Sequence, residues 1–181
     1  MPYFPMMIDI SDKKVLIVGG GKAAFQKVKV LKKFCSDITV SAEKFDYADN
    51  SIHYMTKPFD KSDIDGFDMV IGADNTKVNE TVFKCCREKG IAVNIVDDTD
   101  KSDFMFPAVY TGDSLVVAVS TSGKSPTAAS EIRDDIERSL PDNIEDIIEE
   151  LNVYRAKLKE KGLTYAQRKE LLAQYYKKLL Q

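Results

Sequence analysis

The chain carries three consecutive glycines at positions 19–21, directly after the apolar run Val15–Val18 and before a segment with helical spacing. From Gly19 to Ala24 the residues fit the pattern G-x-G-x-x-A, which binds the diphosphate of a dinucleotide when it joins a strand to a helix. Gly19 would form the turn, and Gly21 would let the diphosphate approach the backbone. The amides at the start of the helix would face the phosphates. The pattern predicts a nucleotide cofactor; the alternative is an ordinary strand-to-helix turn without a ligand.

Acidic side chains at the end of a later apolar run could act as a general base. Asp97 and Asp98 come directly after Asn94–Val96, at the predicted carboxyl end of a strand. In an open parallel sheet this edge binds ligands. An acid there can take a proton from a substrate nitrogen or carbon while hydride leaves for a nicotinamide. The alternative is that these acids only cap a turn.

Three further residues near predicted strand ends could contact the cofactor. Ala73 is small enough to permit its close approach, and Asp74 or Asn75 would cap the helix that follows. Glu43, past the second predicted strand, could accept the ribose hydroxyls of NAD, whereas Lys44 could meet the 2′-phosphate of NADP. Both charges could equally belong to a solvated loop. The residues alone do not choose between the two dinucleotides.

A polar loop before a predicted helix could hold carboxylates. The loop spans Thr121–Pro126 and combines hydroxyls, a glycine, Lys124 and the amides of a helix start. Arg133 lies further along the same predicted helix. The alternative is an ordinary polar loop in which Ser125 caps the helix.

A permanent metal centre is not expected from this sequence. The single histidine, His53, lies in a short predicted strand, where a partly buried structural imidazole is the simpler interpretation. The three cysteines, Cys35, Cys85 and Cys86, lie in predicted helices without C-x-x-C spacing. They are interpreted as buried, reduced thiols.

The composition sets the class of protein. Hydrophobic residues make up 44% of the 181 residues and charged residues 30%, the balance of a globular domain with a small appendage. The formal net charge of −3 provides no basic field that would attract nucleic acid. No apolar stretch approaches membrane-spanning length, and the first residues lack the layout of a secretion signal. A cytoplasmic protein without a membrane partner is predicted.

Apolar periodicity supplies the elements that must position these residues. Helical and strand patterns alternate through the first hundred residues, which predicts a parallel sheet of Rossmann type with helices on its faces. The expected strands are 14–18, 38–41, 52–55, 69–72 and 92–96, and the expected helices are 22 to about 34 and 76–89. Two β-rich runs, 104–110 and 114–120, predict an antiparallel pair around the turn 111–113. Helices are then expected over 126 to about 140, 143–161 and 164–180.

Taken together, these segments resemble the precorrin-2 dehydrogenase family, the NAD-dependent enzymes of sirohaem synthesis. Each matching piece is short, but the set follows the family's order and spacing from residue 3 to about residue 140. The matching pieces are Tyr3-Phe4-Pro5 with Asp9, Val15–Gly21, Ala73-Asp74-Asn75 with Val78-Asn79, Asn94–Asp97, Phe106-Pro107, and Val117–Thr121 through Gly123 and Ser125-Pro126. The helical tail matches only in general character.

The resemblance implies an activity and roles for particular residues. Members of the family oxidise precorrin-2 to sirohydrochlorin with NAD as hydride acceptor, and some also insert a divalent metal as ferrochelatases. The family's catalytic aspartate falls on Asp97, and a functional serine falls on Thr121, whose hydroxyl survives as a site of phosphate contact or modification. Lys124, Ser125 and Arg133 are then candidates for the substrate's carboxylates. The family's NAD contacts fall on Lys22, Ala23, Glu43 and Lys44.

The resemblance also implies a domain order and a homodimer with a shared cleft. The expected regions are an NAD-binding Rossmann domain over 1–112, a dimerisation region over 113–141 and a helical domain over 142–181. One departure is Lys22, which adds a positive charge where the family has a small or acidic residue. A non-catalytic protein that binds NAD or a tetrapyrrole is the alternative function.

Overall fold

Five parallel strands form the sheet of the first half of the chain. The computed structural model describes residues 3–180, and its sheet has the order β3-β2-β1-β4-β5. This order, with the chain reversing direction across the sheet between β1 and β4, is that of the dinucleotide-binding α/β fold. The predicted Rossmann-type sheet is therefore confirmed. The strands are β1 (Lys14–Val18), β2 (Asp37–Ala42), β3 (His53–Thr56), β4 (Met69–Gly72) and β5 (Ala92–Ile95).

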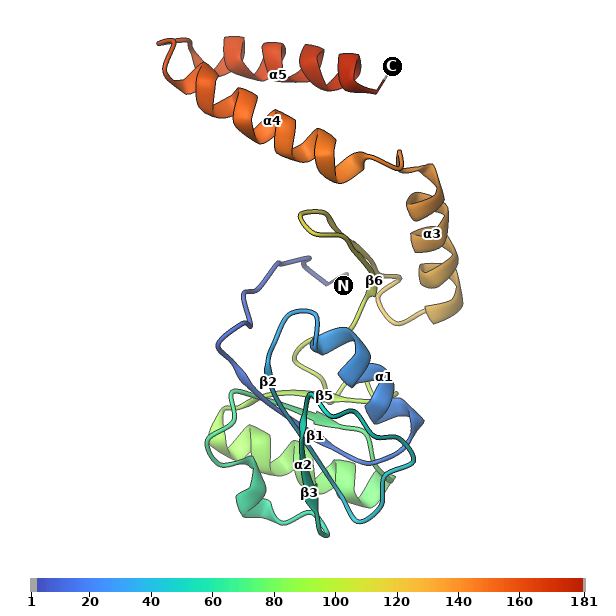
Figure 1. Cartoon of the computed structure of the whole chain (residues 1–181). Coiled ribbons are helices and arrows are strands. Elements are labelled where there is room, and N and C mark those ends of the chain that lie inside the picture. Colours follow the sequence, from blue (N-terminus) through green and yellow to red (C-terminus); the bar gives the residue numbers. More distant parts are fainter. Residues whose placement is uncertain (1–2, 181) are drawn as a thin grey trace. The chain divides into compact units, whose positions relative to one another are not determined.

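Alternating side chains of β1 build a core on each face of the sheet. Val15 and Ile17 pack with α1 (Lys22–Leu31), whereas Leu16 and Val18 pack with α2 (Thr76–Lys89). All four side chains are at most 1% exposed, as expected for a parallel sheet covered by helices on both faces. Figure 1 shows α1 and α2 on opposite sides of the strands. A short 3-10 helix, η1 (Lys61–Ile64), packs beside α2.

A second compact unit begins at Pro107, whereas the first ends at Phe106. Its strands β6 (Ala108–Thr111) and β7 (Val116–Val119) form an antiparallel hairpin that contacts α3 (Pro126–Ser139). Helices α4 (Ile144–Lys159) and α5 (Tyr165–Leu179) pack against each other as a helical hairpin.

The carboxylate of Glu145 joins the start of α4 to the turn of the β6–β7 hairpin. It accepts hydrogen bonds from the amides of Ser114 at 2.8 Å and Leu115 at 3.4 Å. A β-carbon on Gly112 would lie 1.9 Å from a carboxylate oxygen of Glu145. Because residue 112 is glycine, no side chain blocks the position of the Glu145 carboxylate.

Side-chain caps mark the helix starts that the sequence predicts. Asn75 accepts hydrogen bonds from the amides of Lys77 and Val78, and Ser125 accepts one from Ala128. Thr164 and Gln167 form the expected capping box. Gly90 ends α2 in the left-handed conformation, with φ of 67°.

Three local expectations were wrong. The predicted strand over 104–110 begins only at Ala108, because Phe104 and Phe106 pack against the core instead of pairing with another strand. His53 is exposed, because its strand lies at the edge of the sheet. Cys35 lies beyond the end of α1, where its thiol donates to the carbonyl of Lys13 at 3.0 Å.

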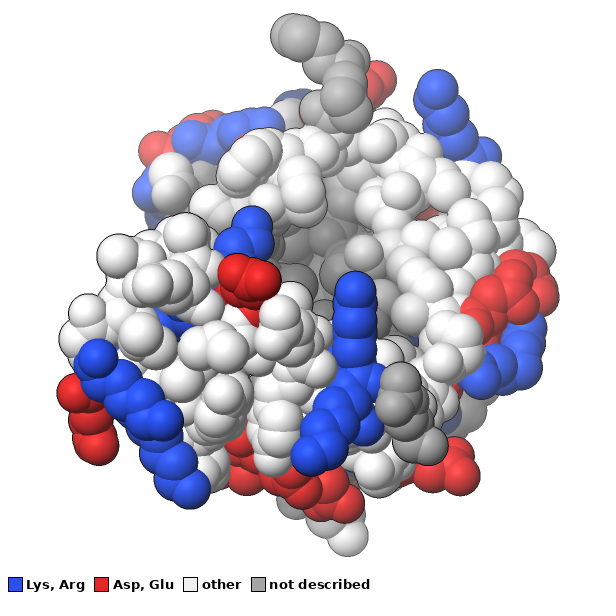
Figure 2. All heavy atoms as spheres, turned by 90° about the horizontal axis from the view of Figure 1, so that it is seen from above, with Lys and Arg blue, Asp and Glu red and all other residues white. Residues whose placement is uncertain are grey.

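Charged side chains of both signs lie on the upper face of the molecule. On the face that Figure 2 shows, Lys and Arg side chains lie among Asp and Glu side chains. Within residues 3–180, no helix combines the length and the apolar character needed to cross a membrane.

The three cysteines are buried and unpaired, as the sequence predicts. Burial raises the pKa of the Cys86 thiol from 9.0 to about 12, and the neighbouring Cys85 adds to the shift. The thiolate is the reactive form, so Cys86 is inert in the folded chain at neutral pH.

The raised pKa leads to a testable pH dependence. Because the unfolded thiol loses its proton near pH 9 and the folded thiol near pH 12, Cys86 favours the folded state below pH 9 and loses that contribution as the pH rises through this window. In a variant with Cys35→Ser and Cys85→Ser, we expect Ellman's reagent at pH 8 to label Cys86 slowly in buffer and rapidly in urea. Equal rates under the two conditions would contradict the prediction.

Candidate functional site

The carboxyl ends of four neighbouring strands meet at one edge of the sheet. Backbone hydrogen bonds hold the segments that leave these ends: the Gly19 amide donates to Ser41 at 2.8 Å, and the Ala73 amide donates to Val18 at 2.7 Å. The amide of Val96 donates to Gly72 at 2.9 Å. The turns after β1, β2, β4 and β5 are thereby held at the edge where this fold binds ligands.

Gly19 and Gly20 allow other backbone segments to approach closely. A β-carbon on Gly19 would lie 2.3 Å from the carbonyl oxygen of Ala73, and one on Gly20 would lie 1.8 Å from that of Lys44. Gly19 also has φ of 130°, a conformation that other residues rarely adopt. The requirement at Gly20 was missed by sequence reasoning, because the loop that meets it is distant in sequence.

Gly21 differs from its two neighbours because the space beside it is open. A β-carbon there would have ordinary backbone geometry, and its nearest neighbour would be the Asp46 carboxylate at 3.7 Å. Gly21 precedes α1 without a side-chain cap among the described residues, so the amides of Lys22 and Ala23 remain available at the helix start. This cradle fits a diphosphate, which needs bare backbone and unpaired amides.

The loop after β2 lies against the glycine turn. Its Asp46 amide donates to the carbonyl of Gly20 at 2.9 Å, and the ring of Tyr47 stacks on Phe25 of α1 at 4.6 Å between centroids. Glu43 and Lys44 are exposed at the start of this loop. The loop thus places an acid and a base beside the cradle.

The buried amide of Asn79 fixes the turn after β4. It accepts from the Asp74 amide at 3.0 Å and donates to the Asp74 carbonyl at 2.9 Å. Of the two residues considered as helix cap, Asn75 has this role, while the Asp74 carboxylate accepts from the amide of Asn75. Ala73 is left half-buried beside Gly19, with no bulky side chain at the edge.

Asp97 lies in a strained turn directly after β5. Its φ is 63°, in the left-handed region that Asp and Asn enter more readily than most residues. The turn is closed by the amide of Asp98, which donates to the carbonyl of Ile95 at 3.1 Å. Asp97 itself is exposed. The backbone therefore presents a carboxylate at the same edge as the glycine cradle.

Side chains in and after β5 fasten the loop that follows Asp97. The hydroxyl of Ser102 accepts from the Ile95 amide at 3.0 Å and donates to the Asp98 carbonyl at 2.7 Å. Asp103 accepts from the amide of Val93 at 3.0 Å. The buried amide of Asn94 donates to the carbonyl of Phe104 at 2.9 Å. These four contacts, all between residues 93 and 104, keep the turn at Asp97 in place.

Lys27 of α1 lies near this loop and was missed by sequence reasoning. Its Nζ is 4.1 Å from the centre of the Phe106 ring. Burial lowers the pKa of Lys27, and the nearby carboxylate of Asp97 opposes that shift. The sequence did contain an indication of this position. Lys27 lies between Ala24 and Val28, which are buried residues of α1, and so borders the buried face of the helix.

The other predicted site residues belong to the second unit. The Thr121 hydroxyl accepts from the Ser125 amide at 2.9 Å and donates to the Ser125 carbonyl at 3.0 Å, which closes the loop before α3. Lys124 is exposed. Arg133 donates to the carbonyl of Val109 at 3.3 Å and forms an ion pair with Asp134.

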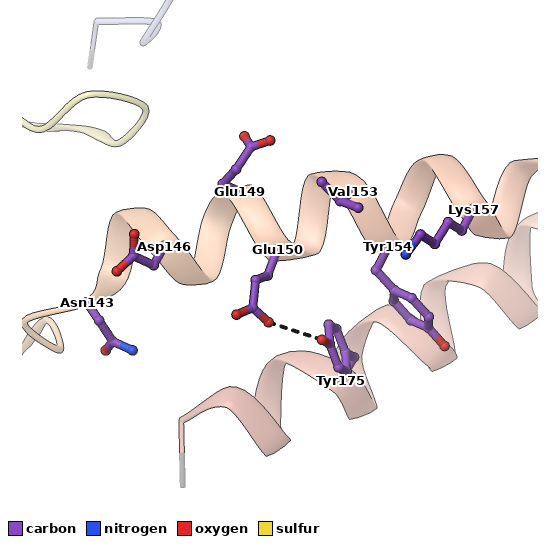
Figure 3. A pocket seen from close by; sticks show the side chains of 8 residues that line it. All are labelled: Asn143, Asp146, Glu149, Glu150, Val153, Tyr154, Lys157 and Tyr175. Carbon is purple, nitrogen blue, oxygen red and sulfur yellow. Dashed lines mark hydrogen bonds between the residues drawn. The ribbon is translucent and has the colours of Figure 1, made fainter.

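A groove of about 600 Å³ runs along α4 and α5 (Figure 3). Asp146, Glu149 and Glu150 line it, and the hydroxyl of Tyr175 donates to Glu150 at 3.1 Å. This hydrogen bond raises the pKa of Tyr175. The groove offers carboxylates and aromatic rings but lacks a diphosphate cradle, so the sheet edge is the better candidate site.

Metal-binding side chains do not gather within the described part of the chain. No three His, Cys, Asp or Glu residues among positions 3–180 lie so as to hold a metal ion.

Comparisons with known proteins agree with this geometry. A family model described as "Putative NAD(P)-binding" matches residues 6–108, and a second, described as "Sirohaem biosynthesis protein central", matches residues 113–139. The chain belongs to this NAD(P)-binding family, whose model covers the sheet and every turn of the candidate site in the first unit.

The more particular relatives are siroheme synthases. The chain is 35% identical to one from Ruthia magnifica over 168 residues, which are 89% of this chain and 36% of that protein. It is 30% identical over 177 residues to one from Buchnera aphidicola, covering 94% of this chain and 37% of the relative. The chain thus spans little more than a third of these relatives' length. A solved chain named "SirC, precorrin-2 dehydrogenase" has the same fold, with a TM-score of 0.76, 22% identity, and coverage of 95% of this chain and 88% of that one.

The glycine turn provides a paired test of fold and ligand binding. We expect Gly20→Ala to lower the melting temperature by several degrees, because its β-carbon would overlap the Lys44 carbonyl. Gly21→Ala should change the melting temperature little and weaken dinucleotide binding at least tenfold, because its methyl group would occupy the open space above the amides. Calorimetry and titration with NAD measure the two effects. Unchanged affinity in Gly21→Ala would remove the cradle from the binding site.

Proposed function

We propose that the chain is an NAD-dependent dehydrogenase that oxidises precorrin-2 to sirohydrochlorin. The observation that carries the proposal is the exposed carboxylate of Asp97, held in a left-handed turn at the edge that also carries the diphosphate cradle. The family match, the siroheme synthases among the relatives and the fold of the solved precorrin-2 dehydrogenase support the choice of substrate.

The oxidation removes two hydrogens from the macrocycle, one as hydride and one as a proton. A bound nicotinamide supplies the acceptor for the hydride. The amides of Lys22 and Ala23 would hold the diphosphate, and the bare backbone at Gly19, Gly21 and Ala73 would leave room for the cofactor at the sheet edge. The Asp97 carboxylate accepts the proton. Its rigid turn contributes to the rate by keeping the acceptor oxygen in place.

Residues after β2 set the choice of dinucleotide. Glu43 and Lys44 lie exposed at the end of the strand where the adenosine ribose binds in this fold. We assign Glu43 to the ribose hydroxyls, which favours NAD over NADP because a carboxylate repels a 2′-phosphate. Lys44 contributes its backbone carbonyl to the packing at Gly20 and leaves its amine in solvent.

The second unit itself carries groups that can bind carboxylates. Lys124 and the start of α3 after Ser125 offer an exposed ammonium and helix amides. Thr121 holds the shape of this loop through its two hydrogen bonds with Ser125. Arg133 contributes positive charge, although its guanidinium also bonds within the unit.

Anaerobic incubation with precorrin-2 and each dinucleotide tests the proposal. The wild-type chain should form NADH and sirohydrochlorin, followed by absorbance, with NAD preferred over NADP. Asp97→Asn keeps a residue that tolerates the left-handed turn and should lower kcat by about 10²–10⁴, the usual contribution of a positioned base. NAD binding should remain unchanged.

Asp100→Asn is the matched control, because Asp100 is an exposed acid on the same loop. It should leave turnover unchanged. Full activity in Asp97→Asn would remove Asp97 from the chemistry. If the wild-type chain binds NAD or sirohydrochlorin without forming NADH, the alternative of a non-catalytic binding protein is correct.

We also propose that the chain forms a homodimer through its second half, with 113–141 as the dimerisation region. Large apolar side chains of this half lie in water, including Ile132 at 47% and Tyr165 at 75% exposure, and an association would bury such surface. Light scattering should give twice the chain mass of 20.3 kDa. Ile132→Glu should shift the mass toward the monomer, whereas the exposed Glu131→Gln control should not. A monomeric wild-type chain would refute this assignment.

A further inference from the structure

An amine of α1 lies partly buried without a hydrogen-bond acceptor. The Nζ of Lys27 has the Phe106 ring on one side, at 4.1 Å from its centre, in a cation–π contact. Among residues 3–180 this amine donates no hydrogen bond and lies within 4.0 Å of no carboxylate. Its three N–H donors are therefore unused by the protein.

Other partly covered lysines of the first unit differ from Lys27 in this respect. Lys57 pairs with Asp63, and Lys101 pairs with Glu80 at 2.7 Å. Lys29, two positions further along α1, also lies over an aromatic ring but is exposed to water. Because Lys27 is only partly buried, its amine can still be reached from solvent, and an anionic ligand could bind its unused donors there.

The surroundings of Lys27 indicate where that ligand would lie. Phe106 and Asp97 both belong to the segment that leaves β5, and Asp97 is close enough to act electrostatically on the amine. Lys27 is more than one helical turn beyond the amides of Lys22 and Ala23, which face a diphosphate. The unused donors of Lys27 are thus placed beside the proposed proton acceptor and apart from the diphosphate cradle.

We infer that Lys27 binds a carboxylate of the tetrapyrrole substrate, fixing the macrocycle beside Asp97. The inference rests on the proposed function, because a tetrapyrrole with acetate and propionate side chains provides anionic oxygens for this amine. A charge-assisted hydrogen bond to carboxylate matches three ammonium donors that donate no hydrogen bond to the described residues 3–180. The contact with the Phe106 ring places the amine beside the segment that leaves β5.

Titration of the full chain with sirohydrochlorin, followed by absorbance, tests this binding role. Lys27→Met keeps the length and helix propensity of the side chain and removes its charge. We expect its dissociation constant for sirohydrochlorin to rise about tenfold to a hundredfold, the range for one charged hydrogen bond. NAD binding and the melting temperature should stay close to wild type. Lys27→Arg should retain affinity within a few-fold, and Lys29→Met, the matched control, should behave as wild type.

Two results would overturn the inference while leaving the proposed function intact. One is wild-type affinity for sirohydrochlorin in Lys27→Met, and the other is a loss of NAD affinity alone in that variant. Failure of the proposed function is distinguishable, because the wild-type chain itself would then neither bind sirohydrochlorin nor form NADH with precorrin-2.

Discussion

The candidate site depends on one constraint: positions 19 and 20 must be glycine, because a side chain at either would overlap another backbone segment. The Ala73 and Lys44 carbonyls occupy the space that a β-carbon would need at these two positions. The turns after β1, β2 and β4 can therefore meet at one edge. Because the backbones are in contact, hydrogen bonds from Gly19 to Ser41 and from Asp46 to Gly20 can form across them. Gly21 is then left open for a ligand.

Further contacts place two charged groups, Asp97 and Lys27, at this edge. The turn at Asp97 has no glycine to relax it, and the loop beyond it is held by the side chains of Asn94, Ser102 and Asp103. Lys27 approaches from α1 over Phe106. The acid and the amine thus come from different elements of one compact unit, and the same packed core positions both.

Much of this arrangement could be predicted from the sequence because its signals are local. The apolar run before Gly19, the spacing of α1 and the caps at Asn75 and Ser125 depend on residues a few positions apart. The requirement at Gly20 could not be predicted, because it arises from Lys44, which only the folded sheet brings near. The same holds for Lys27, whose environment comes from Phe106 and Asp97. The strand predicted from residue 104 failed because apolar residues at a loop's end can fill a core as readily as they pair in a sheet.

The backbone angle at Asp97 also bears on how this chain could evolve or be engineered. Glycine suits a left-handed turn better than any residue with a side chain, by roughly 1 kcal/mol. A screen that rewards only heat resistance would therefore favour glycine at position 97 and discard the carboxylate. Selection for catalysis would instead keep aspartate at position 97, although its backbone conformation there is less favourable than that of glycine.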